Sequence, residues 1–450
     1  MLGPTRVERA VMTSKMNNVM RIAVLVAVMT AWAQPASAAT RYIVRDTLGL
    51  KGINSTCLLL GCSVVGGLGD PSGQVFLITT KDGVDPVKFL LKLLLQVGVT
   101  NAEIDQLAKV QGATASDVPA ALYDRTPVNY YGTTVWNGYL AQTPNQLIWT
   151  AKTQSTFGVT GAGIVAIIDT GVDPDHPALK PVLVGGYDFT RNSNGGNEKG
   201  DVKQSTAAVL DGAQPAYVNQ STAAVLDQST AAVLDGPEYA AFGHGTMVAG
   251  VVHLVAPTAK IMPLKAFRAD GSGYTSDVIR ALYYAQRNGA KIVTMSFSFS
   301  NSSPELASAV KSVASKGLIL VASAGNDGRK ISVYPASYAD VMGVGSTNNY
   351  DQRSSFSNYG SQVVWIAAPG EGIVTTYPYG SYAATWGTSF SAPFVAGTAA
   401  LLVQVSNSAA NEDTAASSLA NANWISEELN HGRLNTYLAV EAYRRALGLR

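Results

Sequence analysis

Residues 163–171 read GIVAIIDTG, and this stretch decides the fold. Residues 164–168 are apolar without interruption, a pattern typical of a strand buried on both faces of a parallel sheet. Asp169 follows at the carboxyl end of the predicted strand, where sites form in open α/β sheets. The glycines within residues 158–163 precede this strand, whereas a dinucleotide-binding fingerprint must follow its strand, so that class of site is excluded.

Strand-like and helix-like segments alternate after this strand. We expect strands at residues 259–266, 291–296, 318–322, 341–344 and 363–367, and helices at residues 276–288, between 303 and 317, and within 432–450. This alternation predicts an α/β fold with a doubly wound, mainly parallel sheet.

Two further segments place polar side chains at predicted helix starts. Residues 243–250 read GHGTMVAG, with His244 in the first turn, and residues 385–393 read TWGTSFSAP, with Ser389 in the first turn. Free N–H groups and the helix dipole at such a position favour a developing negative charge. Pro393 is compatible with a first helical turn. A serine in such a turn is, however, more often a simple N-cap.

Composition limits the classes of protein that fit. The 450 residues favour two or three domains, and 47% hydrophobic with 14% charged residues indicate a well-buried globular chain. The formal net charge of +1, without a long basic run, gives no indication of nucleic-acid binding.

The N-terminus is predicted to be a signal peptide, residues 1–38. Arg21 precedes an apolar run at residues 22–33, and the small residues 36–38 (ASA) fit a cleavage site. An uncleaved anchor is the alternative. No later segment is a transmembrane candidate by this reading, so we expect an exported protein, secreted or periplasmic, without a stable membrane anchor.

Residues 39–115 are expected to form a small α+β module, with strands at 41–45 and 74–79 and a helix at 85–97. Cys57 and Cys62 form either a disulfide or two buried thiols, which we weigh equally. Residues 116–157 are polar and aromatic without periodicity, which favours a linker followed by an N-terminal arm.

An insertion at residues 189–242 contains three copies of the octapeptide QSTAAVLD, at residues 204–211, 220–227 and 228–235. Units this short are below the size of a solenoid repeat. We expect a surface loop expanded by local duplication, with a dedicated binding arm as the alternative.

The order Asp169, His244, Ser389 resembles that of the subtilisin-like serine proteases (subtilases, peptidase S8 family). The resemblance runs from about residue 158 to 440 and implies a catalytic domain at residues 158–450. It rests on five motifs: IIDTGVD at 167–173, HGTMVAG at 244–250, ADGSGYTS at 269–276, ASAGN at 322–326 and GTSFSAP at 387–393.

The resemblance implies a serine endopeptidase with roles for four residues. Ser389 would be the nucleophile, His244 the general base and Asp169 the residue that orients the imidazole, while Asn326 would donate to the oxyanion. Taken singly, Asp169 is better explained as a helix cap or turn former and Asn326 as an ordinary turn residue. Their joint placement favours catalysis.

The resemblance also implies substrate contacts at two edges and a primary pocket. Two departures from the family pattern concern that pocket, because Ser298 and Val333 stand where glycines are usual. We therefore hypothesise a narrowed pocket that prefers small or medium apolar residues. The implied set is Gly271, Ser272, Gly273, Ser296, Phe297, Ser298, Ala324, Gly325 and Val333.

Several further properties follow from the resemblance. The early module corresponds in position to a propeptide that blocks the cleft as an intramolecular inhibitor, and we expect self-cleavage between Lys109 and Asn129. No cofactor is required. The helix after His244 lacks the calcium loop of many relatives, so calcium stays open with no site assigned. We expect a monomer that acts on protein or peptide substrates, and His176, His253 and His431 are expected to be structural or solvated.

Two rivals belong to other functional classes. A catalytically inactive, peptide-binding relative would need a disabled site, whereas all four predicted catalytic residues are present. An α/β-hydrolase esterase would need G-x-S-x-G and the order Ser, acid, His, which residues 387–391 (GTSFS) do not provide.

Overall fold

The computed structural model describes residues 38–110, 113, 118–202, 214–219, 222–226, 237–407 and 410–449. The chain divides into two compact units, the first comprising residues 1–66 and 76–104 and the second residues 67–75 and 105–450. The predicted signal peptide lies outside the described residues except for Ala38.

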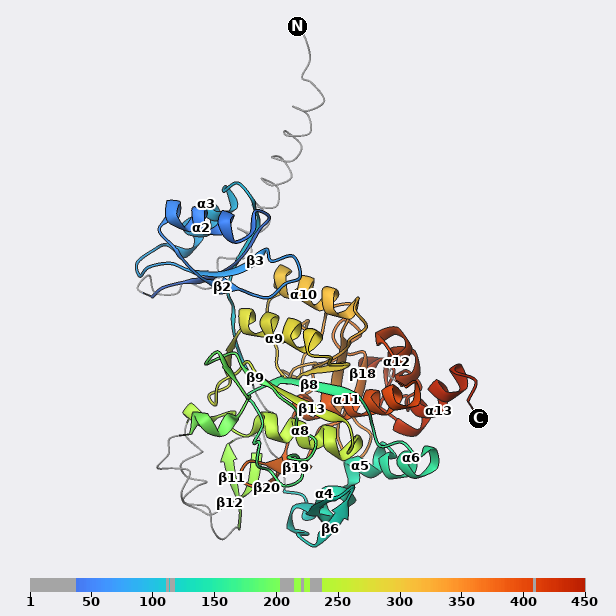
Figure 1. Ribbon diagram of the computed structural model, residues 1–450. Helices are drawn as coiled ribbons and strands as arrows, with labels where there is room; N and C mark the ends of the chain where they lie inside the picture. Colours follow the sequence, from blue (N-terminus) through green and yellow to red (C-terminus); the bar gives the residue numbers. More distant parts are fainter. Residues whose placement is uncertain are drawn as a thin grey trace. The chain divides into compact units, whose positions relative to one another are not determined.

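The first unit is an α+β module with a four-stranded sheet in the order β2-β3-β1-β4. Two helices lie on one face of this sheet (Figure 1). Asp85 caps the second helix by accepting hydrogen bonds from the N–H groups of Val87 and Lys88, and Pro86 stands at its first position. The elements are β1 (Arg41–Asp46), α2 (Gly49–Leu60), β2 (Ser63–Gly67), β3 (Val75–Thr79), α3 (Pro86–Leu94) and β4 (Val99–Ile104).

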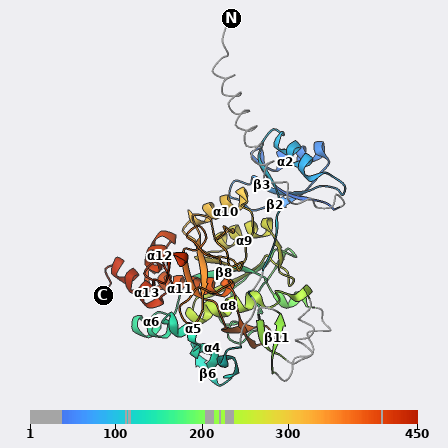
Figure 2. The same ribbon diagram turned by 180° about the vertical axis from the view of Figure 1, so that it is seen from behind.

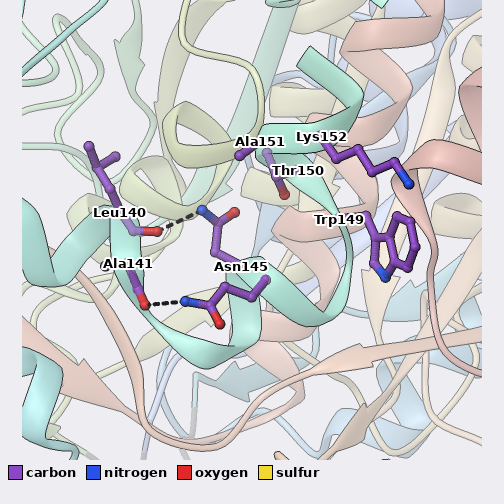
Figure 3. Close-up of a pocket in the computed structure, with 8 residues that line it drawn as sticks. Leu140, Ala141, Asn145, Trp149, Thr150, Ala151 and Lys152 are labelled. Carbon is purple, nitrogen blue, oxygen red and sulfur yellow. Dashed lines mark hydrogen bonds between the residues drawn. The ribbon is translucent and has the colours of Figure 1, made fainter. Parts of the chain in front are cut away.

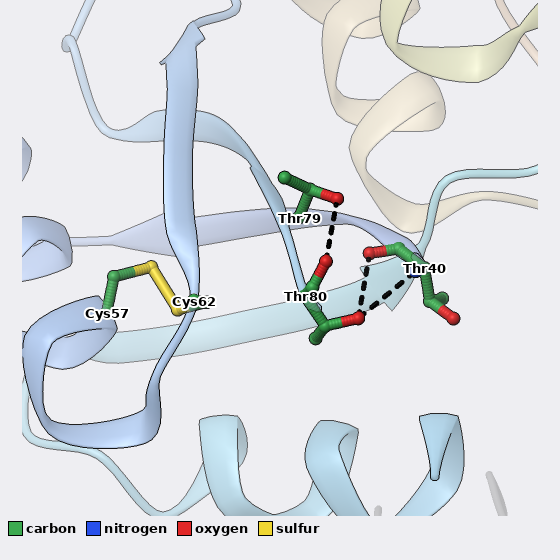
Figure 4. Close-up of a disulfide and its surroundings, with 5 residues drawn as sticks. All are labelled: Thr40, Cys57, Cys62, Thr79 and Thr80. Carbon is green, nitrogen blue, oxygen red and sulfur yellow. Dashed lines mark hydrogen bonds between the residues drawn. A yellow bond between two sulfur atoms is a disulfide. The ribbon is translucent and has the colours of Figure 1, made fainter. Parts of the chain in front are cut away.

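Cys57 at the end of α2 and Cys62 form a disulfide (Figure 4). The same view shows the hydrogen bond that the N–H of Thr40 donates to Thr80 Oγ1 over 3.1 Å. Of the two alternatives left open by the sequence, the structure has the bonded pair. Both cysteines pack at the core of this module, Cys57 within it and Cys62 against it.

The second unit is built on an eight-stranded sheet in the order β10-β9-β13-β8-β15-β16-β17-β18. The neighbours from β9 to β18 pair in parallel and β10 pairs antiparallel at the edge. The strands are β8 (Ile164–Asp169), β9 (Tyr187–Asp188), β10 (Ser193–Asn194), β13 (Lys260–Lys265), β15 (Ile292–Met295), β16 (Ile319–Ser323), β17 (Met342–Thr347) and β18 (Ile366–Pro369). The predicted α/β fold with a mainly parallel sheet is confirmed.

Helices cover both faces of this sheet (Figure 1, and from behind in Figure 2). The pair α8 (His244–Val255) and α11 (Thr388–Val405) lies on one face, and the pair α9 (Thr275–Arg287) and α10 (Pro304–Ala314) lies on the other. Helix α11 is long and apolar enough to span a membrane, which differs from the sequence expectation, but 89% of that window is buried inside the protein. Its apolar character therefore reflects a central position in the core.

The predicted linker and arm, residues 116–157, contains short elements that pack into the main core. Leu122, Val135, Tyr139 and Ile148 are buried there. Its elements are η1 (Ala120–Tyr123), β6 (Pro127–Tyr130), β7 (Thr133–Trp136), α4 (Asn137–Ala141), α5 (Thr143–Leu147) and α6 (Thr150–Phe157). The chain ends in α12 (Glu412–Leu419), η4 (Glu427–Leu429) and α13 (Thr436–Ala446).

The insertion contributes two strands to a second sheet, ordered β11-β12-β20-β19. The second octapeptide copy supplies β12, which pairs antiparallel with β20 in the register Thr222↔Thr385. This copy is therefore a strand and not the expected loop, because β20 offers it an unpaired edge. The other two copies lie outside the described residues. The strands are β11 (Gln214–Asn219), β12 (Thr222–Leu226), β19 (Ile373–Tyr377) and β20 (Ser381–Thr385). In the sequence, η2 (Glu198–Asp201) precedes β11 and η3 (Pro237–Tyr239) follows β12.

The first unit ends at Ile104, before the boundary expected at residue 115. Residues after it belong to the second unit, where β5 (Leu107–Lys109) pairs antiparallel with β14 (Ser272–Tyr274). The expected boundary at residue 115 itself lies outside the described residues.

Candidate active site

Asp169 ends β8 and is fully buried. Its Oδ1 accepts hydrogen bonds from Nδ1 of His244 over 2.8 Å and from the N–H of Thr170 over 2.7 Å. Its Oδ2 has no hydrogen-bond partner among the described residues. The carboxylate therefore has one oxygen committed to the imidazole, which fixes the histidine tautomer with the proton on Nδ1.

His244 begins α8 directly after Gly243, whose φ is 86°. The helix start approaches the end of β8 closely, since a Cβ at Gly245 would lie 2.0 Å from the carbonyl oxygen of Gly171. Only glycine fits at position 245, which explains the Gly that follows His244 in the motif. The Nε2 atom of His244 is buried and has no partner among the described residues, so the basic nitrogen is left available for proton transfer.

Ser389 lies in the first turn of α11, as predicted, and is 2% exposed. Its Oγ donates to the carbonyl oxygen of Ser296 over 3.3 Å. The ring of Phe390, the next residue, lies 5.2 Å from the imidazole of His244. Strand β8, helix α8 and helix α11 thus bring the three predicted residues to one region of the second unit.

Pro393 lies past the first turn of α11, so its expected place in that turn is wrong. Within a helix the N–H of residue 393 would bond the carbonyl of residue 389, and proline has no N–H. Ser296 Oγ donates to the carbonyl oxygen of Ser389 over 2.8 Å instead. The proline therefore frees a carbonyl that ties the nucleophile's backbone to the neighbouring strand end.

Asn326 lies in the loop after β16. Its Oδ1 accepts from both the N–H and the hydroxyl of Thr388, each over 2.9 Å. These two donors identify which end of the amide is oxygen, and the NH₂ end is the one turned from Thr388. The amide is thereby oriented at Thr388, the residue before Ser389.

The two predicted substrate edges flank a segment of the chain itself. Lys109 pairs with Ser272 in the β14–β5 ladder and bridges to Ser298 on the other side. The N–H of Val110 donates to Gly271 O over 2.8 Å, and the N–H of Ala113 donates to Trp386 O over 3.0 Å. An extended segment of this chain thus occupies the strand position between the two edges.

In the predicted primary pocket, Val333 lies beside Gly325, the residue before Asn326. Val333 is buried, and a Cβ at Gly325 would lie 3.5 Å from its Cγ2. The N–H of Gly325 donates to Thr388 Oγ1 over 3.2 Å. Ala324 and Phe297 are buried and Ser298 is half-buried. The valine therefore adds side-chain volume beside Gly325.

A buried polar cluster next to Asp169 and His244 escaped the sequence analysis. Glu198 on η2 accepts a hydrogen bond from the hydroxyl of Thr170 over 3.1 Å and another from the hydroxyl of Thr246. Burial raises the pKa of Glu198 from 4.5 to about 8, against the lowering effect of these donors and of Lys265. Because Glu198 lies within the repeat-bearing insertion, its sequence context resembled a loop.

The remaining histidines are structural in their contacts. His176 Nε2 lies 2.9 Å from Ser381 O, and His253 Nδ1 lies 3.1 Å from the hydroxyl of Tyr139. Burial lowers the pKa of His253 from 6.5 to about 3, which keeps that imidazole neutral. The ring of His431 lies 4.7 Å from that of Trp365. Among the described residues, no three or more His, Cys, Asp or Glu side chains are grouped to hold a metal ion.

A separate surface hollow lies over α4, α5 and α6 (Figure 3). Its wall contains two amide-to-carbonyl hydrogen bonds, from Asn145 to Leu140 and from Gln146 to Ala141. None of the predicted site residues lines it, so the hollow is distinct from the candidate active site.

Comparison with known proteins identifies the family. Residues 161–446 match the Subtilase family. The chain is 35% identical to thermitase from Thermoactinomyces vulgaris over 281 residues, which cover 62% of this chain and 88% of thermitase. It is 34% identical to the thermophilic serine proteinase from Bacillus sp. (strain AK1) over 286 residues, or 63% of either chain.

The structure of fervidolysin from Fervidobacterium pennivorans, a keratinolytic enzyme related to subtilisin, has the same fold. Its TM-score is 0.68 at 21% identity, covering 91% of this chain and 62% of that chain. The chain therefore belongs to the subtilase family and is a subtilisin-like serine peptidase.

Proposed function

We propose that the chain is an exported subtilisin-like endopeptidase, made as a zymogen, which cuts proteins through Ser389, His244 and Asp169. The observation that carries this proposal is the buried 2.8 Å contact between Asp169 Oδ1 and His244 Nδ1, with Ser389 at the head of a helix close by. The family membership supports the same class of reaction.

The mechanism follows from the chemistry of these groups. Ser389 Oγ attacks the carbonyl carbon of the scissile bond while its proton passes to His244 Nε2. Asp169 stabilises the imidazolium, and the Asn326 amide with the N–H of Ser389 stabilises the oxyanion. The intermediate collapses, the C–N bond breaks and His244 returns the proton to the leaving amine. Water then hydrolyses the acyl-enzyme by the same route.

The zymogen proposal is supported by the contacts of Val110 and Ala113. The N–H of Val110 donates to Gly271 on one substrate edge, and the N–H of Ala113 donates to Trp386, three residues before Ser389. We therefore expect self-cleavage between Val110 and Ala113, within the interval from Lys109 to Asn129 expected from the sequence. Until it is cut, this strand excludes other peptides from the edges by occupying their hydrogen bonds.

Other parts of the proposal rest mainly on the sequence. Residues 1–38 would direct export and be removed, and the mature enzyme would be a monomer without a stable membrane anchor. It would require no cofactor, and calcium stays open. Ser298 and the buried Val333 support a narrowed primary pocket for small or medium apolar residues.

One pair of experiments tests this function. The wild-type protein is allowed to process and the reaction is stopped soon afterwards. Mass spectrometry should then give an N-terminus at Gln111, Gly112 or Ala113. The Ser389→Ala variant should remain uncut. Normal processing of the variant would mean that another protease cuts the chain. A fluorophosphonate probe should label wild type and not the variant; absent labelling of correctly folded, processed wild type would favour the inactive peptide-binding alternative.

A further inference from the structure

Glu198 joins the two segments that carry Asp169 and His244. Its Oε2 accepts from the hydroxyl of Thr170, the residue after Asp169, over 3.1 Å and from the N–H of Gly243, the residue before His244, over 3.0 Å. Glu198 is 1% exposed. One oxygen atom thus bridges the end of β8 and the start of α8.

The other oxygen makes a second bridge. Oε1 accepts from the hydroxyl of Thr246 on α8. The same hydroxyl oxygen accepts the N–H of Asp173, in the loop after β8, over 2.8 Å. In parallel, the hydroxyl oxygen of Thr170 accepts the N–H of Gly245 over 3.0 Å. Each threonine therefore relays a hydrogen bond from Glu198 to the opposite segment.

The short helix η2 that carries Glu198 is fixed at its other end as well. Asp201 accepts from Nζ of Lys265 over 2.7 Å, and the fully buried Lys265 also donates to the carbonyl oxygen of Thr170 over 2.7 Å. Thr170 is thus held from two sides, by Glu198 at its hydroxyl and by Lys265 at its carbonyl oxygen. Breaking one member of a buried network is costly because the other polar groups stay buried.

We propose that Glu198 is a positioning residue of this peptidase. It holds His244 against Asp169 by hydrogen bonds to the residue after Asp169 and to residues before and after His244. Glu198 touches neither substrate nor the reacting atoms, and it acts through the backbone that presents the imidazole. The inference rests on the proposed catalytic roles of Asp169 and His244. It assigns a catalytic purpose to the first part of the insertion, before the repeats.

The proposal predicts a specific kinetic pattern. Glu198→Ala removes all three acceptor contacts and should lower kcat by about 10²-fold, the order of loss expected from a misplacement of about 1 Å. Glu198→Gln keeps the shape but substitutes an NH₂ for one acceptor oxygen, so its loss should be smaller. KM should stay within about 2-fold because the substrate edges are untouched.

A double-mutant cycle separates positioning from general stability. In an Asp169→Asn background, Glu198→Ala should lower kcat by less than about 3-fold, because the contact that Glu198 maintains is already lost. Glu305→Gln is the matched control, since Glu305 is a buried glutamate on α10. This control should leave kcat and KM unchanged. Rates are normalised to processed chain measured by mass spectrometry.

The outcomes separate the two proposals. Wild-type kcat in Glu198→Ala, or an equal loss with and without Asp169→Asn, would overturn the positioning role. Full activity of Asp169→Asn would instead contradict the triad itself. If Glu198→Ala does not fold, Thr170→Val removes one relay hydroxyl at nearly constant volume and should show the same dependence on Asp169.

Discussion

The Nδ1 atom of His244 lies 2.8 Å from Oδ1 of Asp169, and both side chains are buried. Asp169→Asn would present an amide to this nitrogen and favour the wrong tautomer. We expect kcat to fall by on the order of 10⁴, the loss known for the corresponding change in another serine protease. Peptide hydrolysis by purified protein measures it. Asp175→Asn, at a largely exposed carboxylate, is the control and should keep normal kcat.

Asn326 uses its oxygen to accept two hydrogen bonds from Thr388. Asn326→Asp keeps that acceptor and removes the NH₂ donor, so it should lower kcat by about 10²- to 10³-fold with little change in KM. Thr388→Val removes only the hydroxyl contact and should cost less. Equal losses in the two variants would indicate that Asn326 acts by holding Thr388 and does not donate to the oxyanion.

Val333 lies beside Gly325 in the predicted primary pocket. Profiling with a peptide library should show wild type cutting after small or medium apolar residues. Val333→Gly together with Ser298→Gly should raise kcat/KM for Phe or Tyr at that position by about 10-fold or more. Efficient cutting after Phe or Tyr by wild type contradicts the narrowed pocket.

Glu198 should make stability depend on pH. Burial raises its pKa from 4.5 to about 8 in the folded state, so the folded chain binds this proton more tightly than the unfolded chain does. Its contribution is therefore largest below pH 4.5 and is lost as pH rises to about 8. The titratable groups that interact electrostatically with Glu198 are Lys265, Asp173, Tyr377 and Tyr379.

Urea unfolding between pH 5 and pH 8 tests this dependence, in a Ser389→Ala background to prevent autolysis. Adding Glu198→Gln should flatten the fall in unfolding free energy, since glutamine does not titrate. The same slope in both proteins would show that other groups cause the dependence.

Gly245 packs against the carbonyl oxygen of Gly171. Gly245→Ala would place a Cβ 2.0 Å from that oxygen, so the start of α8 must move away from β8. We expect loss of both activity and thermal stability. Gly185→Ala is the matched control, because a Cβ there meets nothing within 4 Å. Unchanged activity of Gly245→Ala would mean that the helix start tolerates displacement.

The sequence predicts the parts of the fold that depend on local pattern. The apolar run before Asp169 and the alternation of strands and helices gave the parallel sheet, because such patterns report burial directly. Helix α2 was not predicted, since Gly49 and Gly52 weaken its local signal. Residues 116–157 were assigned to an arm because their short helices are stabilised by packing against the main core.

The residues of the candidate site also fall into those that local sequence patterns predict and those that they do not. Asp169, His244, Asn326 and Ser389 were identifiable from motifs, each read within a short stretch of chain. The role of Glu198 and the hydrogen bond of Val110 could not be predicted, because both depend on contacts between residues far apart in sequence. No local pattern distinguishes a glutamate that bonds the start of a distant helix from one on a loop.

The octapeptide strand β12 pairs with β20, which is followed closely by helix α11 with Ser389 in its first turn. Three copies with identical letters stand in the chain. A gene that lost one copy by replication slippage would still encode a strand of the same composition for that edge. The repeat number can therefore drift between generations while the strand beside β20 is inherited unchanged.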